Sequence, residues 1–322
     1  MRYIVAYINK LAAIPKKPIL NVIMKQLTIS YIFLLLLFQN VMFAQSIDKY
    51  KDKVGNKSIT YYVMQPHTEV VGILILLPGS GENPKTIFKK TSLPQIMASK
   101  GFLTIAPELH NSLFADQNTI DLLNKICETA FQKNDVPNLF IGGFSSGGAV
   151  AVGYAEYLLA SNPSNRLKGI FAIDPPLDLK RLYASALRKI NYPCKGLIMK
   201  EGYSIKAALE NTLGGSPESK PNEYLIHSSY AAGEIDGGNA KILKNIPIRL
   251  YAEPDLNFVK KTYCEDLVIN DINASDLESL YKFLVSAGNK NVEYITTMGK
   301  GFHSWNIVDA PDCANWISSI SN

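Results

Sequence analysis

Short, uninterrupted apolar runs alternate with segments of helical composition along most of the chain. Runs without polar alternation are typical of strands covered on both faces, as in a parallel sheet. Their alternation with helices predicts an α/β fold. The expected strands cover residues 58–66, 70–83, 102–110, 138–144, 169–174, 246–255 and 291–299, and the expected helices cover 118–133, a segment opening at 146, 275–287 and 311–320.

The alternation stops between residues 175 and 245. A helical piece at 179–190 is followed there by polar sequence rich in Gly, Ser, Pro and Asn. About seventy residues without a strong strand are too many for an ordinary connection, so we expect an insertion that acts as a lid over a site. No internal repeat or linker divides the remainder, and residues 45–322 are expected to form one domain with this insertion.

The segment IGGFSSGGAV, residues 141–150, contains one G-x-S-x-G pattern, centred on Ser145 between Gly143 and Gly147. Centred on Ser146 the pattern fails, because Phe144 occupies the first glycine position. Such glycines permit a sharp strand-to-helix turn that exposes the serine hydroxyl. The flanking apolar run and the helical sequence after it supply the strand and the helix. A glycine-rich turn that merely packs tightly is the alternative, and a phosphate-binding loop is disfavoured because no GK[ST] follows.

From these residues onward the chain resembles the α/β-hydrolase superfamily, over roughly residues 58–320, and within it the secreted bacterial esterase-like serine hydrolases. The motifs arrive in the family's order: LLPGSGEN, GGFSSGG, YAEPD and GKGFHSW. The resemblance implies a mostly parallel central sheet flanked by helices, with the lid-like insertion before the penultimate strand. It also implies a triad in the order serine, acid, histidine, here Ser145, Asp255 and His303.

The acid of this triad has three candidates. Asp255 is preferred, because the family usually places its acid a few residues beyond this strand. Glu253 is expected only to begin the turn, whereas Asp174 is a serious rival because some hydrolases carry the acid one strand earlier. His303 would act as the base, with a surface or structural role as its alternative.

An oxyanion hole needs two backbone N–H groups aimed at the tetrahedral intermediate. The resemblance implies one from Ser146, directly after the nucleophile, and one from Ser80 in the PGSG loop. This loop departs from the HGGG form of many lipases and esterases, because proline replaces the histidine. That difference leaves the class of esterase open.

The first 44 residues predict an export signal. Met24 and Lys25 precede the twelve-residue apolar run LTISYIFLLLLF, which is too short for a comfortable membrane span, and Ala44 follows at a plausible cleavage point. We expect a secretory signal peptide over residues 24–44, a start codon misplaced upstream of Met24, and a secreted or periplasmic protein. An uncleaved anchor is the alternative.

Removing this leader changes the meaning of the charge. The full chain carries 33 basic and 28 acidic residues, and residues 1–44 hold five of the basic ones and no acid. The mature protein is therefore formally neutral, which gives no support for a nucleic-acid or anionic-membrane partner. We expect no nucleic-acid partner and, once the signal is removed, no stable membrane insertion.

Metal and cofactor chemistry has few residues available to it. The four histidines and four cysteines show no metal-type spacing, and no cofactor or metal is implied. In an exported protein the cysteines Cys127, Cys194, Cys264 and Cys313 could form one or two disulfides or remain buried thiols.

We therefore expect a serine hydrolase that acts on a small-molecule ester through an acyl-enzyme on Ser145. A peptidase or thioesterase of the same fold is the alternative with the same mechanism. A non-catalytic binding protein that keeps the fold is the alternative from another class. The tyrosines Tyr203, Tyr224 and Tyr230 of the insertion either line its pocket or pack the lid.

Overall fold

An eight-stranded sheet lies at the centre of the fold, in the order β1-β2-β4-β3-β5-β6-β7-β8. The computed structural model describes residues 46–161 and 165–321, so the expected leader lies outside the described residues. The pairs β1–β2 and β2–β4, at one side of the sheet, are antiparallel, and the other strand pairs are parallel. The strands are β1 (Ile47–Val54), β2 (Lys57–Met64), β3 (Gly72–Leu77), β4 (Phe102–Pro107), β5 (Leu139–Phe144), β6 (Leu167–Ile173), β7 (Ile248–Ala252) and β8 (Val292–Thr296).

The apolar runs form strands because both faces of the sheet are covered. In β3, Ile73 and Ile75 belong to the hydrophobic cluster on one face, whereas Leu74 and Leu76 belong to the cluster on the other. All four side chains are fully buried. Successive strand residues point to opposite faces, so a strand covered on both sides must be apolar at every position.

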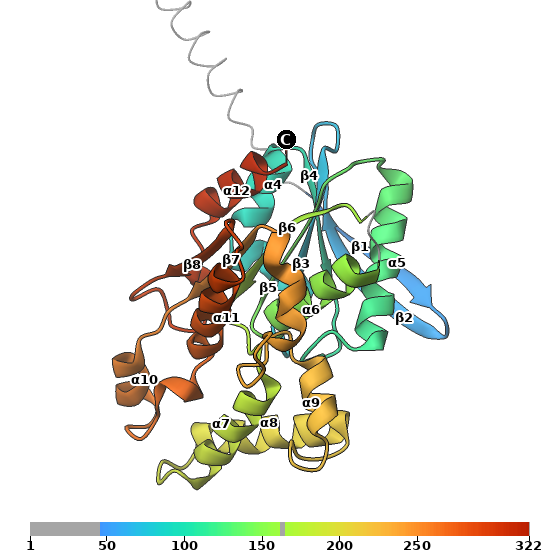
Figure 1. Cartoon of the computed structure of the whole chain (residues 1–322). Coiled ribbons are helices and arrows are strands. Elements are labelled where there is room, and N and C mark those ends of the chain that lie inside the picture. Colours follow the sequence, from blue (N-terminus) through green and yellow to red (C-terminus); the bar gives the residue numbers. More distant parts are fainter. Residues whose placement is uncertain (1–45, 162–164, 322) are drawn as a thin grey trace, which may run out of the picture. The chain divides into compact units, whose positions relative to one another are not determined.

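Helices cover both faces of this sheet (Figure 1). The first cluster receives side chains from α5 (Gln117–Lys133), α6 (Ser146–Ser161) and α11 (Ala274–Ser286). The second receives them from α4 (Leu93–Ser99) and α12 (Ala310–Ser319). The expected α/β architecture is thus confirmed, although β1 and the short helices η1 (Pro84–Thr86) and α3 (Ile87–Lys90) were not anticipated. Within the described ranges, none of the helices has the length and apolar character needed to cross a membrane.

The segment between β6 and β7 forms a group of helices at one end of the sheet (Figure 1). It contains α7 (Leu179–Asn191), α8 (Leu197–Leu213), α9 (Pro221–His227) and η2 (Gly238–Asn245), of which only α7 was predicted from sequence. A separate hydrophobic cluster, made chiefly of side chains from α7, α8 and α9, stabilises the group.

Ion pairs with two buried carboxylates connect α7 to the segment that follows β7. The Arg181 guanidinium binds the carboxylate of Asp276 at the start of α11, and Arg188 binds Asp271 in η3 (Ile269–Asp271) at 2.8 Å. Between β7 and η3 lies one further short helix, α10 (Leu256–Thr262). The inserted helices are therefore joined to the sheet domain by charge pairs as well as by the chain.

Candidate active site

The turn from β5 to α6 places Ser145 in a conformation that L-residues rarely adopt. Its φ is +54°, and α6 begins at the next residue, Ser146. A Cβ atom added at Gly143 would lie 2.3 Å from the carbonyl oxygen of Gly147, and one added at Gly147 would lie 2.3 Å from that of Pro78. Both glycines are therefore required for the backbones to pack this closely. As the sequence predicts, Ser145 is the more exposed serine, whereas Ser146 is buried.

A chain of hydrogen bonds connects three side chains at the carboxyl edge of the sheet. The Oγ atom of Ser145 lies 3.0 Å from Nε2 of His303, and Nδ1 of His303 lies 2.5 Å from Oδ2 of Asp174. With the imidazole proton on Nδ1, the histidine donates to the carboxylate and accepts from the serine hydroxyl. The ring of Phe144 packs against the imidazole with centroids 4.6 Å apart. This is the geometry of a nucleophile, a base and an orienting acid.

The acid in this chain is Asp174, and the preference for Asp255 is corrected. Asp174 directly follows β6, the strand next to β5, and its side chain is almost fully buried beneath His303. The carboxylate of Asp255 instead accepts the N–H of Phe258 at 2.9 Å and caps the N-terminus of α10. An aspartate before a helix is a strong N-cap, so the sequence feature that suggested a catalytic acid has a local structural role.

Backbone strain is concentrated around this site. Among the described residues, five that are not glycine have a positive φ: His110, Asn111, Ser145, Asp174 and Phe302. Ser145 and Asp174 belong to the hydrogen-bonded chain, and Phe302 precedes His303. His110 and Asn111 line a cavity that Ser146 also lines. Such conformations cost about 1–3 kcal/mol each and persist only where the surrounding structure enforces them.

The two serines expected to form an oxyanion hole line one cavity of about 600 Å³. In the loop after β3, the N–H groups of Gly79 and Gly81 donate to side-chain oxygens, each at 2.9 Å. Among the described residues, no protein group accepts the N–H of Ser80 between them, or that of Ser146 at the start of α6. These two donors are therefore available to a bound oxygen.

Glu82 connects the loop after β3 to the loop that carries His303. Its Oε2 atom accepts the N–H of Gly79 at 2.9 Å and the indole N–H of Trp305 at 3.2 Å, while Lys90 pairs with Oε1. The sequence analysis did not single out this glutamate. The sequence feature that could have identified this glutamate is its position three residues after Gly79, the glycine whose N–H it accepts.

Glu253 fixes the loop directly before His303. The carboxylate accepts the N–H groups of residues 300, 301 and 302, at 2.7, 3.3 and 2.9 Å, and the hydroxyl of Thr297 at 2.8 Å. Burial raises the pKa of this carboxyl, but the four donors outweigh burial and hold the pKa below its ordinary value. The expectation that Glu253 merely begins a turn missed this role.

A second cavity, of about 330 Å³, is lined by the histidine itself. His303 and Asp174 line it together with side chains from α8, α10 and η3, so the insertion contributes to a wall of the site. None of the three tyrosines named from sequence lines either of these two cavities. Tyr224 and Tyr230 are buried in packing contacts, and Tyr203 is exposed.

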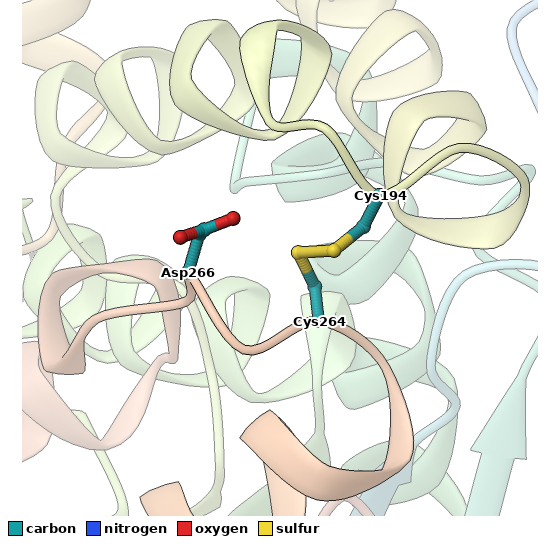
Figure 2. A group of neighbouring side chains, drawn as sticks. All are labelled: Cys194, Cys264 and Asp266. Carbon is teal, nitrogen blue, oxygen red and sulfur yellow. A yellow bond between two sulfur atoms is a disulfide. The ribbon is translucent and has the colours of Figure 1, made fainter.

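The four cysteines adopt two different states. Cys194 and Cys264 form a disulfide with Cα atoms 5.6 Å apart, whereas Cys127 and Cys313 are buried free thiols. Asp266 lies beside the disulfide (Figure 2). In the part of the chain that is described, these three side chains form the one group with metal-ligand spacing, and the S–S bond removes the thiolates that would bind a metal.

The fold is similar to that of several solved esterases and a peptidase. Brefeldin A esterase, a bacterial homologue of human hormone-sensitive lipase, has a TM-score of 0.60 and 14% identity, over 87% of this chain and 79% of that one. The chain has the α/β-hydrolase fold. A carboxyl esterase from Bacillus coagulans has a TM-score of 0.55 and 13% identity, over 87% of this chain and 100% of that one. An acylaminoacyl peptidase from Pyrococcus horikoshii has a TM-score of 0.56 and 14% identity, over 88% of this chain.

The chain spans only 42% of the length of the Pyrococcus peptidase. Its sequence matches no protein-family model and no curated protein. Identities of this size relate the chain to the α/β-hydrolase fold alone.

Replacing Glu253 by glutamine should loosen the histidine loop. An amide keeps one acceptor oxygen but points an NH₂ group at the remaining donors, so about 1–3 kcal/mol of the free energy of unfolding should be lost. Hydrogen exchange at residues 300–303 should become faster. The exposed Glu265 supplies the matched control, and Glu265→Gln should change neither quantity.

The same stabilisation should depend on pH. A carboxyl with a lowered folded-state pKa contributes fully above its ordinary value, about 4.3, and loses the contribution as the pH falls through the folded-state pKa. The difference in stability between wild type and Glu253→Gln should thus be constant from pH 7 to about pH 5 and shrink at lower pH. Equal hydrogen exchange at residues 300–303 in both proteins at pH 7 would show that Glu253 does not hold this loop in place.

Proposed function

We propose that the protein is a serine hydrolase that cleaves carboxylic esters through an acyl-enzyme on Ser145. The observation that carries this proposal is the hydrogen-bonded chain from Ser145 through His303 to the buried carboxylate of Asp174. A serine hydroxyl is a weak nucleophile at neutral pH, and an imidazole within hydrogen-bond distance can remove its proton as it attacks.

In the first step, Oγ of Ser145 attacks the ester carbonyl carbon, and Nε2 of His303 takes the hydroxyl proton. The tetrahedral intermediate then collapses: the bond to the alcohol oxygen breaks, and His303 returns the proton to that oxygen. Water, activated by the same imidazole, next attacks the acyl-enzyme and releases the carboxylic acid and the free serine. Asp174 holds the tautomer with the proton on Nδ1 and stabilises the imidazolium that forms in each step.

The N–H groups of Ser80 and Ser146 would stabilise the negative oxygen of each tetrahedral intermediate. Both lack a protein acceptor in the described structure and line the same cavity, and Ser146 stands at the positive end of the α6 dipole. Loss of one such donor typically reduces kcat by about 100- to 1,000-fold. A backbone donor does not require the histidine that other families carry in this loop.

Ester hydrolysis is proposed ahead of peptide or thioester hydrolysis because it needs nothing beyond these groups. Two of the similar structures are named esterases and one a peptidase, and those names describe those proteins. A panel of esters, thioesters and acyl-peptides, compared by kcat/KM, separates the three activities because only the leaving group differs.

Covalent labelling by a small fluorophosphonate tests the nucleophile. Oγ of Ser145 should bond to phosphorus, fluoride should leave, and His303 should take the proton. Wild type should label. Ser146→Ala should label as well, because the substitution leaves the backbone N–H of residue 146 in place. Ser145→Ala should not label, because it lacks the hydroxyl that attacks phosphorus. Absence of label and of ester hydrolysis from all three folded proteins would favour a non-catalytic protein with this fold.

The identity of the acid is tested by two aspartate-to-asparagine variants. Asp174→Asn should lower kcat by about 10⁴-fold, since an amide favours the wrong imidazole tautomer. Asp255→Asn should stay within about twofold of wild type, because asparagine caps a helix as well as aspartate does. Circular dichroism controls for folding in both. The reverse order of activities would return the role to Asp255.

We also propose that the protein is exported, as its first 44 residues suggest. The Cys194–Cys264 disulfide supports this proposal, because disulfides persist in oxidising compartments such as the periplasm and are rare in the cytosol. The exported protein should begin at Gln45 when its N-terminus is sequenced. Recovery of the full chain from the cytosol alone would contradict export.

A further inference from the structure

The cavity beside His303 is suited to an apolar group. Its volume is about 330 Å³, and His303 and Asp174 are among its lining residues. Seven of its lining residues are aliphatic or aromatic: Leu197, Ile198, Val259, Tyr263, Leu267, Ile272 and Phe302. At about 30 Å³ for a group the size of a water molecule, the cavity holds about ten such groups.

The charged residues that line this cavity already have partners. The ammonium group of Lys189 lies 3.1 Å from the carboxylate of Glu201. The carboxylate of Asp271 accepts from Arg188 at 2.8 Å and from the hydroxyl of Tyr192 at 2.7 Å. A charged ligand would have to break these pairs, whereas an apolar ligand would leave them intact.

The position of the cavity assigns it to one half of an ester. In the proposed reaction, His303 must return its proton to the alcohol oxygen, so the leaving alcohol lies on the histidine side of the scissile bond. His303 lines this cavity, whereas Ser80 and Ser146, the proposed donors to the carbonyl oxygen, line the other one. The alcohol half therefore extends toward the apolar cavity.

The Cys194–Cys264 disulfide joins two chain segments (Figure 2). Residues near each of its cysteines line the cavity. Cys194 lies three residues before Leu197 at the start of α8, and Cys264 lies between Tyr263 and Leu267 at the end of the α10 segment. Between residues 256 and 270 only Val259, Cys264 and Leu267 are buried, so the disulfide is one of few anchors of this wall.

We propose that the cavity binds the apolar alcohol group of the substrate, an alkyl chain of up to about ten carbons, and that the Cys194–Cys264 disulfide holds its walls at the required spacing. This inference rests on the proposed function and adds the substrate class to it. The protein is thus an esterase for alkyl esters whose apolar part leaves first.

Isomeric esters test the assignment directly. Hexyl acetate and ethyl hexanoate have the same composition but carry the chain in the alcohol and the acyl half, respectively. For alkyl acetates, kcat/KM should rise about fourfold for each buried methylene from ethyl to hexyl, because kcat/KM reports acylation, when the alcohol is still bound. Ethyl hexanoate should show no such gain over ethyl acetate. A gain in the acyl series alone would overturn the assignment.

Filling the cavity should remove the preference. Ile198→Trp should lower the hexyl-to-ethyl ratio of kcat/KM for the acetates at least tenfold, because the indole occupies the space of the longer alkyl chain. Leu187→Trp is the matched control, because Leu187 is an exposed residue of α7 that does not line the cavity, and it should behave as wild type. An unchanged hexyl preference in Ile198→Trp would overturn the proposal.

Breaking the disulfide tests its role as a brace. Dithiothreitol should reduce the hexyl-to-ethyl ratio of wild type at least fivefold, the size of one to two methylene steps, while fluorophosphonate still labels Ser145. The Cys194→Ser, Cys264→Ser double variant should show the lower ratio with or without reductant. If that variant does not fold, the measurement on reduced wild type is the test. A hexyl-to-ethyl ratio that stays the same after complete reduction would show that the disulfide does not hold the cavity walls.

Labelling separates the two possible failures. A protein that labels at Ser145 but shows no chain preference overturns this inference and keeps the proposed hydrolase. A protein that neither labels nor hydrolyses any ester overturns the proposed function, and the substrate assignment with it.

Discussion

The close approach of three backbones at the β5–α6 turn is the constraint on which the site depends. The loop after β3 passes so near the first turn of α6 that no side chain fits at Gly147, and the end of β5 is equally close at Gly143. This packing enforces the left-handed conformation of Ser145 and brings the proposed oxyanion donors to the same place. Close packing of the backbone, more than any side-chain contact, thus determines where Ser145 stands.

Two glutamates, the partly buried Glu82 and the buried Glu253, extend this constraint to the loops around the site. Glu82 holds the loop after β3 and contacts the indole of Trp305, and Glu253 binds three consecutive N–H groups before His303. A histidine on a loop needs such support, because its ring must stay within hydrogen-bond distance of both Ser145 and Asp174. The loop after β3 and the loop that carries His303 are consequently fixed to each other as well as to the sheet.

The sequence predicted the sheet and the serine because both depend on local patterns. Apolar runs marked the central strands, and the glycine spacing around Ser145 identified the turn. The choice of the acid depended instead on which aspartate lies beside His303. Asp255 is about fifty residues from this histidine and Asp174 about 130, and both aspartates follow a strand. Only the three-dimensional arrangement separates a carboxylate under the imidazole from one that caps a helix. The helices α8 and α9 were missed because their polar sequence becomes helical through the small core that they share with α7.

The two unpaired cysteines have a consequence for the chemistry that the protein can undergo. Cys127 and Cys313 lie in different hydrophobic clusters on opposite faces of the sheet, and burial raises the pKa of each thiol to about 12. Thiolate, the form that attacks disulfides and oxidants, is therefore nearly absent at neutral pH. While the protein stays folded, neither thiol can attack the Cys194–Cys264 bond. The described structure therefore keeps this one disulfide pairing even where oxidants are abundant.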